Sequence, residues 1–279
     1  MQKAIERAIA TMWDRYDQPL SLSEVADTAI LSRFYFSRVF RSITGTSPGR
    51  FLAAVRLQRA KNILLESTLS VTDISYRVGY NSPGTFTSRF TSSVGMSPTR
   101  YRWMSHVGMA PLPEGEPPAQ VITPRSVVRG YGSVHGRVTM PPSDIPMRIY
   151  VGAFNGPIAQ GLPVACDILE SSGSFLLNAV PEGAWFIRAV AVAVRDIDPR
   201  PWARSPLFVG ASHLVSIGSG SAQRLDIDMH RTCTLDLPVL LALPELDSRL
   251  VPAQARRQLR EPGIWQAPAR EAADFELVG

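Results

Sequence analysis

The chain has 279 residues and an ordinary hydrophobic content of 45%, so it is long enough for two globular domains. Its 2 cysteines, Cys166 and Cys233, are far apart and lack a Cys-x-x-Cys or histidine partner spacing, which excludes a disulfide scaffold and leaves a zinc site without support. The net charge of +5 is unevenly divided: residues 1–109 hold fourteen Arg and Lys against seven Asp and Glu, whereas the remainder holds fifteen against seventeen. A polyanion partner is therefore expected for the first part alone.

The N-terminal residues MQKAIERAIATMWDRY carry Glu6 and Asp14 among their apolar positions, so they do not predict an export signal. The most apolar stretches elsewhere, such as 189–194 and 238–244, are far shorter than the roughly 20 residues of a membrane helix. We therefore expect a cytoplasmic protein with no membrane partner.

One segment of the chain is repeated: FSRVFRSITGTSPGRF (36–51) returns fifty positions later as FTSRFTSSVGMSPTRY (86–101). In each copy two phenylalanines recur at i, i+4 and mark one apolar stripe of a helix. The glycines that follow, Gly45 and Gly95, predict left-handed helix ends, and the Ser-Pro pairs at 47–48 and 97–98 predict the cap and first residue of a further helix.

A shorter helix precedes each copy. The Ser-x-x-acid patterns at 21–24 and 70–73 predict capping boxes, and Ser32 or Ser82 starts the next helix after a turn. Two short helices joined by a tight turn form a helix-turn-helix, whose second helix enters the major groove of DNA. Between the copies, residues 51–67 predict a connecting helix of about 22 Å.

A helical repeat that packs on another protein would have a similar pattern. The division of charge, the paired capping boxes and the presence of two units, too few for a solenoid, favour DNA as the partner.

After Met109 the composition changes. Residues 110–131 are rich in proline and predict an extended linker. Beyond the linker, apolar residues alternate with period two between turns, which predicts an antiparallel β-sandwich of about seven strands at 132–243. The predicted strands begin at Gly132, Met147, Pro163, Gly173, Ala184, Pro206 and Gln223. Residues 244–279 form a weakly patterned tail that is either a packing extension or disordered.

Signals of catalysis are missing from the sequence. There is no Walker or His-Glu-x-x-His motif, and the four histidines are scattered. Asp226 and Asp228 alternate onto one strand face, which suits an acid pair or metal site, but with no third ligand in the pattern a solvated face is favoured. We expect no enzyme, no catalytic residues, no metal and no cofactor.

Residues 5–103 also resemble the DNA-binding domain of AraC/XylS-type transcription regulators. The most specific stretch is VTDISYRVGYNSPGTFTSRFTSSVGMSPTRYR (71–102), and residues 56–67 resemble the linker helix of that family. The resemblance implies two helix-turn-helix units joined by that helix. It places base-facing positions of the first unit on Arg33, Phe34, Ser37 and Arg38. Those of the second unit fall on Pro83, Gly84, Thr85, Thr87 and Ser88.

Three further arginines complete the predicted DNA interface. Many relatives carry Arg at the position of Ser88 and an apolar residue at that of Arg89, so Arg89 is either a base contact or a solvated charge. Arg100 and Arg102 are expected to contact phosphate. On the residues themselves, Arg38 suits a bidentate contact to guanine or a phosphate contact, and Phe34 a contact to a thymine methyl group.

The stretch GSFLLNAVPEGAWFIRAV (173–190) resembles the strand-turn-strand of carboxypeptidase-regulatory-like, transthyretin-type β-sandwiches. Such modules imply ligand or protein contact. The sequence thus predicts a transcription regulator that binds double-stranded DNA and is regulated through its C-terminal β-sandwich. Its other expected partners are RNA polymerase or another protein, and a small-molecule effector at the C-terminal domain. The rival hypothesis is a scaffold protein in which the β-sandwich does the principal work and DNA binding is ancillary.

Overall fold

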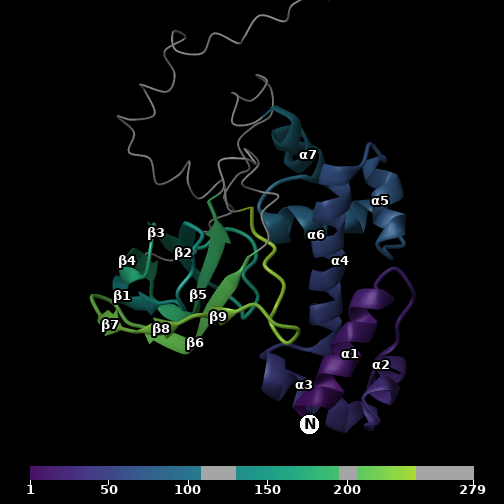
Figure 1. Ribbon diagram of the computed structural model, residues 1–279, viewed down its shortest axis with the longest axis horizontal. Helices are drawn as coiled ribbons and strands as arrows, with labels where there is room; N and C mark the ends of the chain where they lie inside the picture. The colour runs from purple at the N-terminus through teal and green to yellow at the C-terminus, as the bar shows by residue number, and fades with distance from the viewer. Residues whose placement is uncertain (108–129, 195–205, 243–279) are drawn as a thin grey trace, which may run out of the picture.

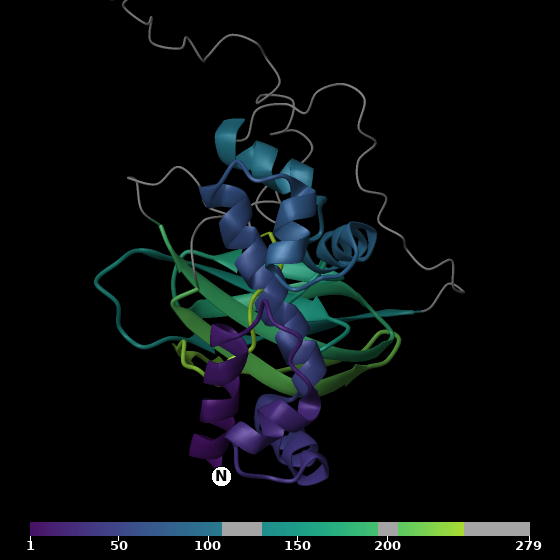
Figure 2. The same ribbon diagram turned by 90° about the vertical axis from the view of Figure 1, so that its right-hand side faces the viewer.

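The computed structural model describes residues 1–107, 130–194 and 206–242. A helical part (residues 1–107) lies against a β part (residues 130–242), and a quarter turn of the view brings the helices in front of the sheets (Figures 1 and 2). Most of the predicted linker and the whole predicted tail at 244–279 lie outside the described residues. The predicted domain boundaries therefore stay predictions.

The helical part contains two helix-turn-helix units on either side of one long helix. The described helices are α1 (Gln2–Asp14), α2 (Leu22–Thr28), α3 (Arg33–Thr44), α4 (Pro48–Glu66), α5 (Val71–Arg77), α6 (Pro83–Val94) and α7 (Pro98–Val107). The repeated segment therefore forms α3 and α6 together with the starts of α4 and α7. At 19 residues, α4 is longer than the sequence predicted and spans about 28 Å.

The predicted helix ends are largely confirmed. Ser21 and Glu24 form a complete capping box, and Gly45 and Gly95 end their helices at φ 76° and 94°. At the start of α5 the box is only half formed: the Asp73 N–H donates to the Ser70 hydroxyl, and the Asp73 carboxylate accepts from that hydroxyl. The Asp side chain is one methylene shorter than Glu, which limits its reach to the backbone.

Two apolar cores hold the helices, and α4 belongs to both. Near its start, Phe51 and Val55 pack with α1, α2 and α3. Further along, Ala60 and Leu64 pack with α5, α6 and α7. Because each short helix pair buries its apolar face on the same α4, this helix fixes the two units relative to each other.

The β part contains two sheets. Its described strands are β1 (Tyr131–Thr139), β2 (Met147–Phe154), β3 (Ala165–Leu169), β4 (Gly173–Pro181), β5 (Gly183–Ala193), β6 (Phe208–Ile217), β7 (Ala222–Arg224), β8 (Ile227–Asp228) and β9 (His230–Arg231). One sheet has the order β4-β1-β7, with β8 also paired to β1; the other has the order β3-β2-β5-β6-β9.

The predicted antiparallel pairing is wrong for part of the first sheet, because β7 and β8 pair with β1 in parallel. The chain returns from β6 in the second sheet to β1 by a turn at 218–221 and then follows β1 in the same direction. The stretch predicted as a single strand from Gln223 is divided into β7, β8 and β9, since it leaves the first sheet and joins the second at His230.

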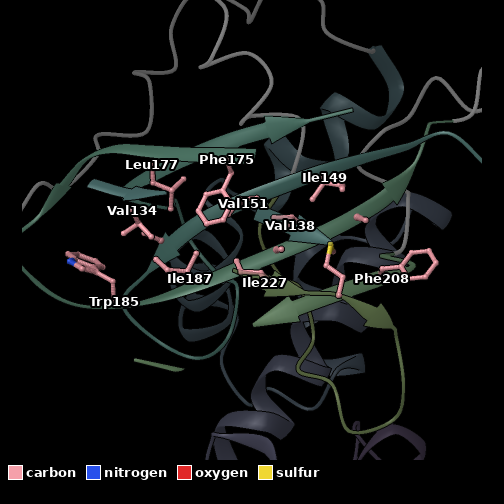
Figure 3. Packing of buried hydrophobic residues seen from close by; sticks show 14 of the residues in the cluster. Val134, Val138, Ile149, Val151, Phe175, Leu177, Trp185, Ile187, Phe208 and Ile227 are labelled. Carbon is pink, nitrogen blue, oxygen red and sulfur yellow. The ribbon is translucent and has the colours of Figure 1, made fainter. Parts of the chain in front are cut away.

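The apolar core of the β part lies between its two sheets (Figure 3). Val134 and Leu177 from the first sheet and Val151 and Ile187 from the second are fully buried. Phe175, Leu177 and Val180 of β4 also point into this core, and each is at most 3% exposed. The alternate residues of β5 point to the other face of the second sheet, toward the helical part.

After β9 the chain leaves the sheets as the 232–242 segment, which runs between the β part and α4 (Figure 1). Leu235 packs on the first helical core, whereas Leu240 and Ala242 belong to the second. The Ala242 N–H donates to the carbonyl of Val94 in α6 at 3.1 Å. The two parts therefore share apolar cores, which the sequence did not predict. No described helix combines the length and apolar content needed to cross a membrane.

Candidate nucleic-acid interface

Helix α3 directs its aromatic stripe inward and its predicted base-facing residues outward. Phe36 and Phe40 are fully buried. The opposite face carries the four predicted residues, of which Ser37 is half-buried and the others are exposed: Arg33, Phe34, Ser37 and Arg38. The structure therefore brings the predicted residues of the first unit together on one accessible helix face.

Two arginine–aromatic stacks form on this face. The Arg33 guanidinium lies 4.8 Å from the ring centre of Phe34, and that of Arg38 lies 5.2 Å from the ring centre of Tyr35. Phe34 is 76% exposed, an unusual position for a large apolar ring. Among the described residues neither arginine has an acidic partner. The stacks thus orient planar cations whose N–H donors are available to an external acceptor.

Helix α6 offers a different surface. Its buried face again consists of phenylalanines, Phe86 and Phe90. The predicted residues on the other side are small or hydroxyl-bearing, with Gly84, Thr85 and Ser88 exposed and the rest half-buried: Pro83, Gly84, Thr85, Thr87 and Ser88. This surface can approach a groove closely, but it carries no charge of its own.

Arg89 lies on the side of α6 that faces the β part. It borders a cavity of about 340 Å³ whose walls include Tyr80 from the second helix-turn-helix and Gln160 from the β2–β3 loop. Burial raises the pKa of the Tyr80 phenol, and the nearby charge of Arg89 offsets part of that rise. The structure therefore places Arg89 at the boundary between the two parts.

The two arginines of α7 are partly buried. The Arg102 guanidinium donates to the carbonyls of Leu64 and Leu69, at 3.3 and 2.5 Å, and so ties α7 to the turn between α4 and α5. Arg100 is half-buried, and its backbone N–H donates to the hydroxyl of Ser97. The phosphate contacts predicted for both residues stay predictions.

The β part touches the C-terminal ends of both candidate recognition helices. At α3, Ile43 and Thr44 line a second cavity together with Pro157 of the β2–β3 loop. At α6, the carbonyl of Ser93 accepts a hydrogen bond from the Gly161 N–H at 2.5 Å. Sequence reasoning missed this contact because no local pattern marks a loop as the partner of a distant helix.

One group of potential metal ligands exists among the described residues. His230, Cys233 and Asp236 have ligand atoms within 4.8 Å of one another. The expectation that Cys233 lacks a histidine at partner spacing is therefore wrong, because His230 and Asp236 each lie three residues from it. Both Asp236 oxygens already accept hydrogen bonds, from the His230 ring at 2.9 Å and from the Cys233 N–H at 2.7 Å. These hydrogen bonds close the turn after β9, and this structural role explains why the three side chains lie close together.

The acidic pair considered in the sequence has structural partners as well. Asp226 accepts from the Arg137 N–H, and Asp228 accepts from the Thr139 hydroxyl. Both side chains are exposed. They fasten β8 and the preceding residues to β1, in agreement with the solvated face that the sequence favoured.

Comparison with known proteins identifies the helical part. Residues 25–104 match the family model of a helix-turn-helix domain. An uncharacterised HTH-type transcriptional regulator of Haemophilus influenzae is 36% identical over 100 residues, which cover 36% of this chain and 34% of the relative. The melibiose operon regulatory protein of Escherichia coli K12 is 28% identical over 101 residues, 36% of this chain and 33% of that protein. The chain thus spans about a third of the length of these relatives.

Solved structures match the same part of the chain. A transcriptional regulator with an AraC-type DNA-binding domain from Chromobacterium violaceum is 25% identical, with a TM-score of 0.37, and the match covers 38% of this chain and 96% of that one. The DNA-binding domain of AdpA in complex with a target DNA is 28% identical, with a TM-score of 0.36, over 38% of this chain and 97% of that one.

Proposed function

We propose that the whole chain is a sequence-specific transcription regulator of the AraC/XylS type that reads two adjacent major-groove segments with one polypeptide. The match of residues 25–104 to a helix-turn-helix domain and the similarity to HTH-type transcriptional regulators support this proposal. The observation that carries this proposal is that α3 exposes a face with two arginines and that α3 and α6 both pack on α4. The two candidate recognition helices are therefore held in a fixed arrangement. Recognition helices in such units read base edges from the groove.

The two helices are proposed to read by different means. Arg33 and Arg38 can offer bidentate donors to guanine, and Phe34 an apolar contact to a thymine methyl group. The small face of α6, from Pro83 to Ser88, suits close approach and hydroxyl contacts. The two halves of the DNA site are therefore expected to differ in sequence and to lie about 10 to 10.5 bp apart.

The β part is proposed to be the regulatory module, a β-sandwich of the carboxypeptidase-regulatory-like or transthyretin type. Its contacts with the ends of α3 and α6 support this role, because anything that alters the β part acts directly on both recognition helices. Its partners would be RNA polymerase, another protein or a small-molecule effector. The relatives are named as regulators and not as enzymes, which supports a non-catalytic role. The scaffold alternative is less favoured.

A binding experiment on the full chain tests the proposal. DNA selected from a random pool is footprinted, and affinity is then measured for the selected site and its single-base variants at several salt concentrations. Arg38→Ala is expected to cost about 1–3 kcal/mol and to relax preference at one position. Arg137→Ala, a change of an exposed arginine in β1, is the matched control. Binding that is equal for all sequences, or a protected region of one groove segment per chain, contradicts the proposal.

A further inference from the structure

Arg188 is a charged residue on a sheet face that is otherwise apolar. Along β5, Ile187 and Ala189 enter the core of the β part, whereas Arg188 and Val190 point to the face that the helical part and the 232–242 segment cover. Around it on that face, Val190 and Val192 pack with Leu241 and two aromatic residues of β2. A strand in this position has no structural need for a guanidinium.

Among the residues that the structure describes, the Arg188 guanidinium has no polar partner. Its Nε atom is buried without a hydrogen bond, and no acid of the described residues pairs with it. Its one ring contact is with Phe186, whose ring centre lies 5.5 Å away. Burial lowers the pKa of Arg188 to about 10, so the group is still charged at neutral pH. A partly buried charge without a partner carries a desolvation cost, and such a group at the edge of a cavity is a candidate for binding an anion.

Arg188 borders an internal space between the two parts of the protein. This cavity has a volume of about 190 Å³, slightly more than the about 150 Å³ that accommodates benzene in an apolar protein core. Most of its wall is apolar and comes from four sources: the last turn of α3, the covered sheet face, the β2–β3 loop and the 232–242 segment. Representative residues are Ile43, Val209 and Leu237.

The other polar side chains of the cavity do not satisfy Arg188. His230 and Asp236 also line it, but the two Asp236 oxygens accept from the His230 ring and the Cys233 N–H. Thr44 donates its hydroxyl to the carbonyl of Phe40 in its own helix. The cavity thus has apolar walls and one guanidinium group that no other side chain of the cavity pairs with. A ligand with an anionic group and an apolar body would match both features.

We propose that this cavity binds a small carboxylate with an apolar body of about the size of a benzene ring, with the carboxylate held by the Arg188 guanidinium. The ligand would contact α3, the β5–β6 face and the 232–242 segment at once. As a regulatory site it rests on the proposed function, because its effect on DNA affinity would follow from a change in how the β part holds α3.

The test uses benzoate as the probe and benzamide as its neutral isostere, titrated by calorimetry into the full chain. Benzoate is expected to bind saturably, and benzamide and the Arg188→Gln variant to lose at least about tenfold in affinity, the loss of a charge-assisted hydrogen bond. Arg137→Gln is the matched control and should bind as the unchanged protein does. Failure of benzoate to saturate the protein, or equal binding by Arg188→Gln, overturns the inference.

Stability without ligand gives a second, independent readout. Replacing a partly buried charge that has no partner by an apolar side chain of similar length removes a desolvation cost, so Arg188→Met should raise the Tm of the empty protein. It should also abolish the further rise of Tm that benzoate produces in the unchanged protein. A lower Tm for Arg188→Met means that the guanidinium already has a stabilising role, and this contradicts the inference.

Titrating the selected DNA site with and without saturating benzoate separates this inference from the proposed function. Specific DNA binding by a protein that does not bind benzoate overturns the carboxylate site alone. Benzoate binding through Arg188 by a protein without sequence preference overturns the proposed function and leaves a carboxylate-binding site. Benzoate binding that leaves DNA affinity unchanged overturns the regulatory role of the cavity.

Discussion

The Nζ atom of Lys61, in the helix shared by the two helix-turn-helix units, donates to the carbonyl oxygen of Leu241 at 3.4 Å. A second bond joins it to the carbonyl of Val239 at 3.3 Å. The side chain is buried, and burial lowers the pKa of Lys61 from 10.5 to about 8. The Lys61 ammonium group therefore connects α4 to the 232–242 segment. Its burial removes the charge from water, which disfavours the charged form of the side chain.

This geometry predicts a pH dependence of stability. Between about pH 8 and pH 10.5 the folded protein binds fewer protons at Lys61 than the unfolded chain does, so the free energy of unfolding should rise with pH in this window. The gain is at most roughly 3 kcal/mol, and the two carbonyls reduce it because they favour the charged form. Tyr101, whose ring lies 5.8 Å from Nζ, does not titrate in this window because burial raises its pKa.

Urea unfolding of the full chain at several pH values measures the effect. The Lys61→Met variant keeps the apolar stem and lacks the titrating group, so its free energy of unfolding should change less between pH 8 and 10.5. Identical profiles for the two proteins would mean that Lys61 does not titrate in the folded state.

Leu240 is predicted to stabilise the helical part although it belongs to the C-terminal half of the chain. It is fully buried in the core formed by α4 to α7. Leu240→Ala should lower the free energy of unfolding by about 2–5 kcal/mol. It should also increase amide hydrogen exchange in α6, where Ala242 bonds to Val94. Leu214→Ala, at a residue 55% exposed, is the control. Unchanged exchange in α6 would show that the helical part is independent of this segment.

Much of the helical part could be predicted from local patterns. The caps at Ser21 and Gly45 and the Phe36–Phe40 stripe each depend on residues close in sequence. The same pattern occurs again in the second copy of the repeat, which supports the predicted helix boundaries. The parallel pairing of β7 with β1 and the packing of Leu240 on α4 depend on contacts between distant segments. The alternation of apolar residues shows which face of a strand is buried, but it does not identify the neighbouring strand.

The same limit applies to the candidate site. Arg33 and Arg38 lie opposite the buried stripe of α3, so their exposure follows from helical periodicity. Arg89 borders a cavity shared with the β2–β3 loop, and Arg102 bonds the carbonyls of Leu64 and Leu69, so both depend on segments distant in sequence. Arg188 had a local signal that was overlooked: a single arginine within the apolar strand AWFIRAVAVAV.

The turns of the two helix-turn-helix units favour glycine at the same position of the repeat. Introducing a glycine there should therefore stabilise the protein, and removing one should destabilise it. Ile30 and Gly79 occupy the same position of the repeat, and both have left-handed backbones, at φ 58° and 81°. A β-branched residue is strained there, so Ile30→Gly should stabilise the protein by about 1 kcal/mol. Gly79→Ala should destabilise it, because a Cβ would lie 2.9 Å from the Tyr16 carbonyl oxygen.

Thermal unfolding of the two variants beside the unchanged protein checks this prediction. Ile30 is 80% exposed, so the loss of its side chain removes little buried area. A fall in Tm for Ile30→Gly would show that the side chain contributes more than the backbone strain costs.

Arg89→Ala is predicted to alter DNA affinity without altering base preference. Arg89 borders the cavity next to Tyr80 and Gln160, so its loss changes how α6 contacts the β part. Affinities for the selected site and its single-base variants should therefore change by the same factor. Ser88→Ala, on the exposed face of the helix, is the matched change and should affect one base position. A loss of preference at a single base with Arg89→Ala would place this arginine in the groove.

The 232–242 segment also has a consequence for biosynthesis. The helices leave the ribosome first, but the partner of Lys61 follows 180 residues later, roughly 10 to 40 s at usual elongation rates. Until then the apolar faces that receive Leu235 and Leu240 are uncovered on the nascent chain. The helix-turn-helix pair thus reaches its final packing only after residue 242 has been synthesised. A truncated product that stops before residue 235 would lack part of both helical cores, so the helix-turn-helix pair is fully packed only when the 232–242 segment is present.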